Sequence, residues 1–183
     1  MISCDNFFTS EECKKWILHA ENINFEKVYH EATKEIAYRN HYRLNFDDED
    51  IGNKVFKRIS NILPETMKII DNKRAETCSP NIRIYKYDSS EKNQSFGCHI
   101  DESNYVNNYI SKCTVLIYLN DIDKGGRTLF YSGTVNKKNL LHEIEPKEGR
   151  LLIHGHGHRC MLHEGEAILE GIKYVLRTDI LYS

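Results

Sequence analysis

The chain has 183 residues, of which 40% are hydrophobic and 28% charged, and its formal net charge at pH 7 is −2. A chain of this length can form one domain whose core needs no disulfide bonds. Its lysines and arginines are spread along the sequence, which argues against a surface dedicated to nucleic acid or to an anionic membrane. We therefore expect neither kind of partner, and the oligomeric state is left open.

The cysteines and the apolar runs bear on the compartment. The six cysteines form no Cys-x-x-Cys pair and are not densely spaced. The N-terminus carries no apolar signal segment, and no run approaches the roughly 18 apolar residues that a membrane span requires. These features predict a reduced, soluble protein of the cytoplasm.

The first part of the chain shows helical patterns. Thr9-Ser-Glu-Glu12 is typical of a capping box, and apolar residues then recur at helical spacing to about residue 23. A second helix is predicted to begin in the acidic segment 47–50, because acidic groups favour a helix N-terminus, and to end at Pro64. We therefore predict that residues 1–80 are a helical support region with short loops.

After about residue 80 the apolar residues alternate with a period of two, which is the pattern of strands. The predicted strands are 82–87, 113–119, 128–131, 150–153 and 172–182. Short strands separated by turns indicate a sandwich or barrel. The sequence thus predicts a mainly β fold with N-terminal helices, as a single domain of residues 1–183 with its β core at 81–183. The polar loops 88–95 and 101–109 are expected to contact the substrate.

Two histidines and an aspartate suggest a metal centre. His99 and Asp101 are separated by one residue, so in an extended segment their side chains point to the same side and can share one metal. His163 follows 64 residues after His99 and is a candidate third ligand. Two imidazoles and one carboxylate are typical of a non-haem Fe(II) oxygenase. Three further histidines are alternatives for the third position, or for a separate metal site or a polar strand end: His154, His156 and His158.

Six short motifs in one order strengthen this interpretation. They are Arg83-Ile-Tyr-Lys-Tyr87, His99-Ile-Asp101, Leu116-Ile-Tyr-Leu-Asn120, Gly125-Gly-Arg-Thr128, Leu162-His-Glu-Gly165 and the segment 171–179. Together they closely resemble the catalytic domain of the prolyl 4-hydroxylase-like 2-oxoglutarate/Fe(II) dioxygenases. Segments 8–13 and 39–43 also resemble the helical lead-in of that family. The resemblance covers nearly the whole chain and does not specify the substrate.

The resemblance implies a fold and a ligand set. The implied fold is a double-stranded β-helix, a jelly-roll or cupin-like barrel flanked by helices, with Fe(II) at one mouth. His99, Asp101 and His163 match the three metal ligands of the family. The Leu-His-Glu-Gly context of His163, ten residues before a strand lysine, favours it over the three alternative histidines.

The resemblance also implies how 2-oxoglutarate is held. Lys173 matches the cation that binds its distal carboxylate. Arg177 points to the same side of the strand about 13 Å away, so it cannot easily share that carboxylate and is expected to contact the cosubstrate, the prime substrate or a salt-bridge partner. Tyr87 and Tyr118 match tyrosines that hydrogen-bond the cosubstrate, although either could be a core tyrosine. Two further residues are candidates for the inner wall: Thr128 as a structural threonine and Arg83 as one that could face the cavity.

The implied reaction uses Fe(II), 2-oxoglutarate and O2, with ascorbate as a further candidate cofactor. We expect hydroxylation of an unactivated C–H bond, in a prolyl or other residue of a peptide or protein, with release of succinate and CO2. The alternatives are hydroxylation of a free amino acid or other small molecule, a catalytically silent barrel that binds or senses, and a cupin-like metalloprotein that uses no keto acid. Asp101 favours hydroxylation over halogenation, because halogenating relatives lack a coordinating side chain there.

Overall fold

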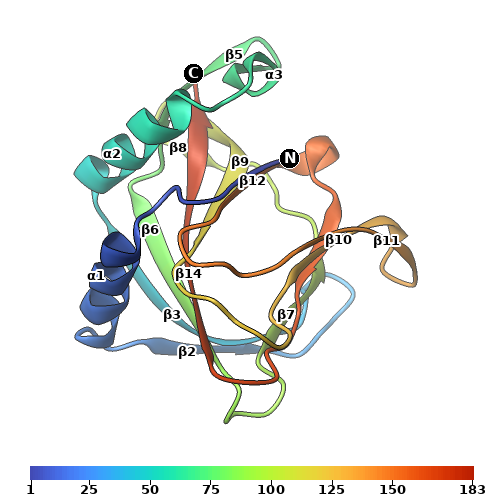
Figure 1. The fold of residues 1–183 in the computed structure, drawn as a ribbon. Helices are drawn as coiled ribbons and strands as arrows, with labels where there is room; N and C mark the ends of the chain where they lie inside the picture. Colours follow the sequence, from blue (N-terminus) through green and yellow to red (C-terminus); the bar gives the residue numbers. More distant parts are fainter.

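The computed structural model describes all 183 residues (Figure 1). In chain order its elements are β1 (Ile2–Cys4), α1 (Ser10–Glu21), β2 (Glu26–His30), β3 (Arg39–Asp47), α2 (Glu49–Ser60), α3 (Glu65–Lys68), β4 (Ile69–Ile70), β5 (Lys73–Cys78), β6 (Asn81–Asp88), β7 (Ser95–His99), β8 (Tyr105–Val106), β9 (Tyr109–Tyr118), β10 (Thr128–Thr134), β11 (Lys137–Ile144), β12 (Leu151–Gly155), the 3-10 helix η1 (Gly157–Arg159), β13 (Leu162–Gly165) and β14 (Ile172–Tyr182).

The strands form one antiparallel sheet that curls on itself. Its neighbours run in the order β1-β12-β9-β14-β6-β3-β7-β13-β10-β11, with β2 paired to β3 at one side. The strands β7, β13 and β10 therefore form one wall, and β9, β14 and β6 form the other (Figure 1). This curled sheet confirms the predicted β fold with flanking helices.

The longest strand shows why both faces of the sheet are buried. Along β14, Tyr174, Leu176 and Ile180 belong to the main apolar core, whereas Lys173 and Arg177, at odd-numbered positions, line the interior of the curl. Successive residues of a strand point to opposite faces, so the outer face is apolar and the inner face is polar. Apolar packing therefore stabilises the outer face of the sheet, and the inner face carries the polar and charged side chains.

The helices α1 and α2 cover that outer face (Figure 1). Glu21 at the end of α1 accepts hydrogen bonds from the Tyr174 hydroxyl at 2.6 Å and from Lys86 at 2.8 Å. In α2, a Cβ on Gly52 would lie 2.8 Å from the Cys78 carbonyl oxygen, so only glycine allows this close approach to β5. None of the helices combines the length and apolarity that crossing a bilayer requires.

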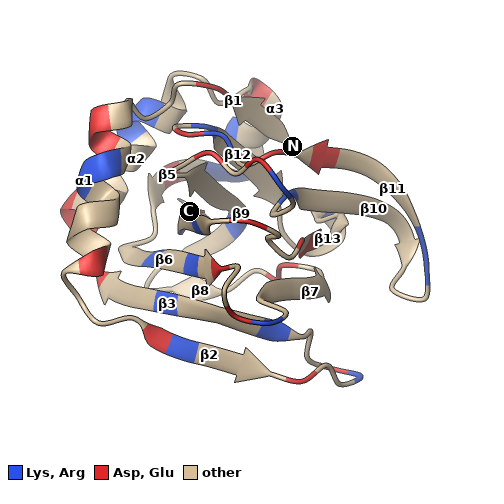
Figure 2. Ribbon diagram, turned by 60° about the horizontal axis from the view of Figure 1, so that its bottom comes forward, with Lys and Arg blue, Asp and Glu red and all other residues tan.

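The prediction that residues 1–80 are helical is wrong for much of that segment. The predicted helices are confirmed as α1 and α2, and Thr9 and Glu12 form the capping box. However, β1, β2, β3, β4 and β5 also lie before residue 80, and β3 is part of the wall around the interior (Figure 2). Pro64 does not end α2, which stops at Ser60; it caps α3 instead.

Candidate metal and cosubstrate site

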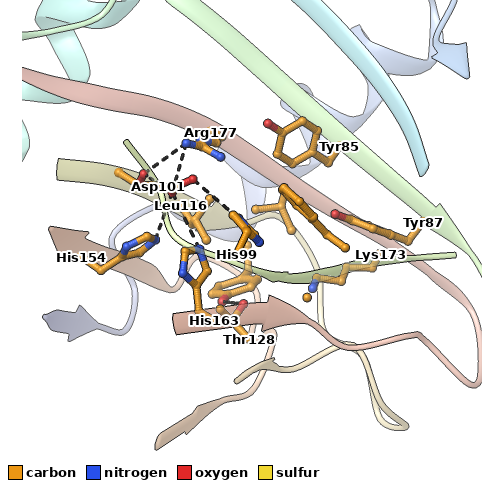
Figure 3. Close-up of a pocket in the computed structure, with 15 residues that line it drawn as sticks. Tyr85, Tyr87, His99, Asp101, Leu116, Thr128, His154, His163, Lys173 and Arg177 are labelled. Carbon is orange, nitrogen blue, oxygen red and sulfur yellow. Dashed lines mark hydrogen bonds and ion pairs between the residues drawn. The ribbon is translucent and has the colours of Figure 1, made fainter. Parts of the chain in front are cut away.

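The inner faces of the two walls enclose a pocket (Figure 3). The residues that line it are Tyr85, Tyr87, Phe96, His99, Asp101, Thr114, Leu116, Tyr118, Thr128, His154, His163, Gly165, Lys173, Val175 and Arg177. They come from β6, β7, β9, β10, β12, β13 and β14 and from the residue two positions after β7. All seven residues that the sequence singled out for the metal and the cosubstrate lie in this lining.

The pairing of β7 with β13 brings the first three candidates together. His99 and His163 stand directly opposite each other in the register of these strands. Asp101 follows the end of β7, with its Oδ1 3.6 Å from His99 Nε2 and its Oδ2 3.8 Å from His163 Nε2. One ligand atom from each of the three residues lies within 4.8 Å of the others. Strand pairing thus places His99 and His163 next to each other although they are far apart in the sequence.

Both histidines have one nitrogen fixed by the backbone. His99 Nδ1 lies 2.8 Å from the Gly97 carbonyl, and His163 Nδ1 lies 3.0 Å from the Met161 carbonyl. A carbonyl only accepts, so each Nδ1 carries the proton and each Nε2 lone pair points into the pocket. His99 Nε2 is buried without any hydrogen-bond partner. A buried polar atom without a partner fits a metal ligand, and the backbone contacts provide the orientation that ligating histidines usually have.

Burial keeps His163 neutral. Its ring is 4% exposed, and burial, reinforced by the neighbouring His99, lowers its pKa to about 4. Only the neutral imidazole binds a metal. The His99 ring stacks on Phe96 with centroids 3.7 Å apart, which covers this side of the pocket with an apolar surface.

Asp101 is held in its ionised form by a buried network. Its Oδ2 accepts from the Thr114 hydroxyl at 2.6 Å and from Arg177 at 3.1 Å. Burial alone would raise the pKa of Asp101, but the charge of Arg177 and the adjacent histidines outweigh it and hold the pKa well below its usual value. Arg177 also lies 3.6 Å from Asp179, and Arg83 donates to the other oxygen of Asp179. Arg83 therefore joins the network behind the pocket and does not line it.

The three alternative histidines lie in three different surroundings. His154 is 1% exposed and its Nε2, which has no hydrogen-bond partner, lies 3.7 Å from Asp101 Oδ2. His156 Nε2 contacts the Thr114 hydroxyl at 2.8 Å, behind the pocket. His158 is exposed on η1. They do not gather into a separate metal site.

Sequence reasoning missed a second possible ligand group. Cys160 lies beside both His154 and His163, and one ligand atom from each of these three residues lies within 4.8 Å of the others. The Cys160 sulfur also accepts a hydrogen bond from the Asp101 backbone N–H at 3.3 Å. Nothing in the spacing of Cys160 distinguished it, because this contact depends on the path of the chain around η1.

Lys173 is a buried cation without an acidic partner. It is 4% exposed, donates to the Gly126 carbonyl oxygen and lies over the rings of Tyr87 at 5.3 Å and Tyr118 at 5.6 Å. The nearest acidic influence is Glu166, which is bound to Arg127 at 2.8 Å. Burial lowers the pKa of Lys173 to about 8. A buried ammonium is expensive unless an anion pairs with it, so this site fits a carboxylate ligand.

The glycine at position 126 leaves space for the Lys173 side chain. Gly126 has φ +71°, and a Cβ there would lie 2.8 Å from Ile168 and 3.4 Å from the Lys173 side chain. A residue other than glycine would therefore be strained and would crowd the lysine. The Tyr118 hydroxyl is hydrogen-bonded to the Thr128 hydroxyl at 2.6 Å, which gives Thr128 a place in the inner wall.

Comparison with known proteins agrees with this geometry. Residues 82–178 match the family model of the 2OG-Fe(II) oxygenase superfamily, which is more than half of the chain, so the chain belongs to this superfamily. It is a 2-oxoglutarate-dependent dioxygenase, for which Fe(II) is the metal and 2-oxoglutarate and O2 are the cosubstrates. A search of curated proteins found no match.

Several solved structures share the fold. A viral collagen prolyl hydroxylase from Paramecium Bursaria Chlorella virus-1, in complex with 2-oxoglutarate, is 19% identical with TM-score 0.62, covering 98% of this chain and 94% of its own. A prolyl hydroxylase from Trichoplax adhaerens, in complex with a hypoxia inducible factor peptide fragment, is 19% identical with TM-score 0.66, covering 98% and 82%. A Pseudomonas putida prolyl-4-hydroxylase is 12% identical with TM-score 0.64, covering 98% and 90%. These similarities confirm the double-stranded β-helix.

Proposed function

We propose that His99, Asp101 and His163 hold the Fe(II) of this dioxygenase. Their ligand atoms converge, and the two imidazoles present their free nitrogens to the same space. Two imidazoles and a carboxylate are the ligand set that non-haem Fe(II) oxygenases use. Asp101 has one oxygen occupied by Thr114 and Arg177, which leaves the other for the metal.

Lys173 is proposed to bind the distal carboxylate of 2-oxoglutarate. The observation that carries this assignment is a fully buried ammonium with no ion pair, at the opposite end of the pocket from the three metal ligands (Figure 3). The rings of Tyr87 and Tyr118 flank it, and their hydroxyl groups are candidates to hydrogen-bond the cosubstrate. Arg177 was also predicted to contact 2-oxoglutarate; its ion pairs with Asp101 and Asp179 favour a role in positioning Asp101.

The residues of the chain then have separate tasks. Lys173 and the metal ligands bind and orient 2-oxoglutarate, and Arg177 and Thr114 keep Asp101 ionised and directed at the metal. Phe96 and Phe130 stack on His99 and His163, which keeps water from the ligand side of the pocket. When bound, Fe(II) with 2-oxoglutarate supplies the activation of O2.

The reaction proposed for this site is hydroxylation of an unactivated C–H bond. One atom of O2 enters the substrate as a hydroxyl group and the other enters succinate, with loss of CO2 from 2-oxoglutarate. The solved relatives are described as prolyl hydroxylases, one of them with a peptide bound, which supports a prolyl or other residue in a peptide or protein as the substrate. A free amino acid or other small molecule is the alternative.

Succinate formation by the purified protein tests this function. With Fe(II), 2-oxoglutarate and O2 but no prime substrate, we expect slow succinate formation that Asp101→Ala abolishes and that the exposed control His158→Ala leaves intact. A protein that binds metal and 2-oxoglutarate but forms no succinate, alone or with a peptide library, would be a silent barrel. A gain of one oxygen atom in a peptide or in a free amino acid, read by mass spectrometry, separates the two substrate classes.

A further inference from the structure

The strand β3, which lies between β6 and β7 in the sheet and so joins the two walls, carries two arginines that form no ion pair. Arg39 and Arg43 alternate with His41 along β3, so the three side chains share one face. In the strand register Arg39 is opposite Phe96 of β7, and Arg43 is opposite Tyr85 of β6. Both of these partners line the pocket, and directly opposed residues lie side by side on one face. The blue bands on β3 in Figure 2 mark the two arginines.

Neither arginine forms a hydrogen bond or an ion pair through its side chain. Both side chains are half-buried, and the Nε atom of each is buried without a hydrogen-bond partner. Neither forms an ion pair, whereas Arg83 and Arg177, deeper in the same interior, both contact Asp179. An arginine carries five N–H donors in a planar fork that matches a carboxylate. A guanidinium group with unpaired donors beside a pocket can therefore bind an anion.

Arg39 lies close to the proposed metal ligands. Its guanidinium stacks over the Phe96 ring at 4.2 Å from the centroid, and the other face of Phe96 stacks on His99 at 3.7 Å. Only one aromatic ring therefore separates this cation from a candidate ligand. An anionic group bound by Arg39 would hold the atoms attached to it near the metal position.

The charges of the interior leave these two cations in excess. Asp101 and Asp179 offset Arg177 and Arg83, and Lys173 is assigned to 2-oxoglutarate. His41, between the two arginines, adds no anion: burial, together with the charges of Arg39 and Arg43, lowers its pKa to about 3, so it stays neutral. Fe(II) and the dianion of 2-oxoglutarate cancel each other, which leaves the charges of Lys173, Arg39 and Arg43. The remaining positive charge favours an anionic prime substrate.

We propose that Arg39 and Arg43 bind a carboxylate of the prime substrate and thereby place its reactive C–H bond beside the metal. This assignment rests on the proposed function, because it takes the pocket to be filled by Fe(II) and 2-oxoglutarate. The carboxylate can belong to a free amino acid or chain terminus, or to an acidic side chain next to the hydroxylated residue. In each case the guanidinium forks recognise the same group.

Acetate is the simplest probe of this subsite. The protein is loaded with Zn(II) and N-oxalylglycine, so that the metal position and Lys173 are filled, and the arginine Nε–H signals are followed by nitrogen-15 NMR during an acetate titration. We expect the signals of Arg39 and Arg43 to shift. Arg39→Gln or Arg43→Gln should weaken acetate binding about tenfold, the size expected for one charge-assisted contact. The exposed Arg74 on β5 provides the control Arg74→Gln, which should change nothing.

Matched ligand pairs identify the source of the carboxylate. Tighter binding of N-acetylproline than of N-acetylprolinamide would assign it to a free amino acid or chain terminus. Tighter binding of an N-acetylated prolyl-glutamate amide than of its glutamine counterpart would assign it to an acidic side chain in a peptide. Three results would overturn the subsite: equal binding of every acid and its amide, no acetate response at either arginine, or acetate binding that is unchanged when Arg39→Gln and Arg43→Gln are combined in one protein.

The same variants distinguish a failure of the proposed carboxylate subsite from a failure of the proposed function. Fe(II) and 2-oxoglutarate affinities of Arg39→Gln and Arg43→Gln should equal those of the unaltered protein, since neither arginine touches the three ligands or Lys173. Their melting temperatures should change little, because neither arginine forms a hydrogen bond or an ion pair through its side chain and Arg39→Gln loses only the stacking on Phe96. An unaltered protein that does not bind 2-oxoglutarate contradicts the function; one that binds it but does not bind acetate contradicts only the subsite.

Discussion

Asp101 shows how the neighbours of one buried carboxylate keep it ionised and fix its orientation. Removing a carboxylate from water favours its protonated form, yet Arg177 at 3.1 Å and the Thr114 hydroxyl at 2.6 Å both stabilise the charge. Thr114 has one proton and donates it to Asp101, so His156 Nε2, at 2.8 Å, is the donor to Thr114. The orientation of Asp101 therefore depends on residues that do not themselves reach the metal position.

The first prediction concerns which of the two ligand groups holds the metal. Burial raises the pKa of the Cys160 thiol to about 12, so it stays protonated at neutral pH and is a poor ligand, whereas Asp101 is ionised. We expect the Co(II)-substituted protein to show no thiolate charge-transfer band and Cys160→Ser to retain Co(II). Asp101→Ala should lose affinity by at least about tenfold, since even second-sphere changes often have that effect.

The opposite pattern would identify the other group. An intense thiolate band, together with loss of Co(II) in Cys160→Ser and its retention in Asp101→Ala, would mean that His154, Cys160 and His163 hold the metal. His158→Ala is a matched histidine control, because that side chain is exposed on η1 and contacts none of these residues.

At the scale of the elements, a variant in α1 tests whether this helix affects the site only by stabilising the sheet. Thr9 Oγ1 accepts from the Glu12 N–H at 3.2 Å, and Glu12 accepts from the Thr9 N–H at 2.8 Å. Thr9→Ala should lower the free energy of unfolding by about 1 kcal/mol, as loss of an N-cap does, and Thr9→Ser should restore it. Urea denaturation measures the change. Metal affinity should be unaltered, and its loss in folded Thr9→Ala would show that α1 positions the site directly.

The strands differ in how clearly their sequences predict them. The strands β6, β9, β12 and β14 are visible in the sequence because alternate apolar residues of each lie in the main core. In β3 the interior face carries Arg39, His41 and Arg43, so a pattern that seeks buried apolar residues does not find it. Because α1 and α2 flank β2 and β3 in the chain, their helical patterns favour a helical interpretation of the whole segment. The error falls on a strand whose inner residues we assign to substrate binding.

The residues of the candidate site could be named from the sequence more readily than the strands around it. His99, Asp101 and His163 could be named because ordered motifs surround them, and the structure brings their side chains together. The contacts of His154 and Cys160 could not be, because they depend on how the chain turns through η1 after β12. Likewise, the stacking of Arg39 on Phe96 depends on the pairing of β3 with β7, and the elements from α2 to β6 lie between these strands in the chain.

In the whole molecule, stability and chemistry occupy opposite faces of one sheet. The outer face joins α1 and α2 in the main apolar core, whereas the inner face buries His41, His154, His163, Lys173 and the network around Asp101. Burying polar groups without full compensation lowers stability, so the inner face is maintained by the packing of the outer one. The consequence is a protein whose stability depends on pH through its buried histidines.

The pH dependence follows from lowered histidine pKa values. His41 has its pKa lowered to about 3, chiefly by burial, so at pH 5 it is neutral in the folded protein and protonated in the unfolded chain. Its contribution to stability is complete above pH 6.5 and is lost as the pH falls from there toward 3. His41→Phe should therefore reduce by about one the number of protons taken up on unfolding near pH 5, or about 1.4 kcal/mol per pH unit.

Denaturation of the metal-free protein between pH 7 and 5 measures this slope. His154 and His163 have pKa values lowered to about 3 and about 4, so they act in the same direction and the slope should persist in part in His41→Phe. The exposed His158→Ala should leave the slope as it is. An unchanged slope in His41→Phe would mean that His41 is protonated in the folded state.

The central claim is that Lys173 and the three metal ligands form one cosubstrate site. It is tested most directly by titrating 2-oxoglutarate into the anaerobic protein at saturating Fe(II), followed through the metal-to-ligand charge-transfer band. A buried charge-assisted contact contributes on the order of 1.5–3 kcal/mol, so Lys173→Ala should bind 2-oxoglutarate about tenfold to a hundredfold more weakly. Its Fe(II) affinity should barely change. Arg177→Ala, which frees Asp101, should weaken Fe(II) more than 2-oxoglutarate. A larger loss of 2-oxoglutarate affinity in Arg177→Ala than in Lys173→Ala would contradict the account.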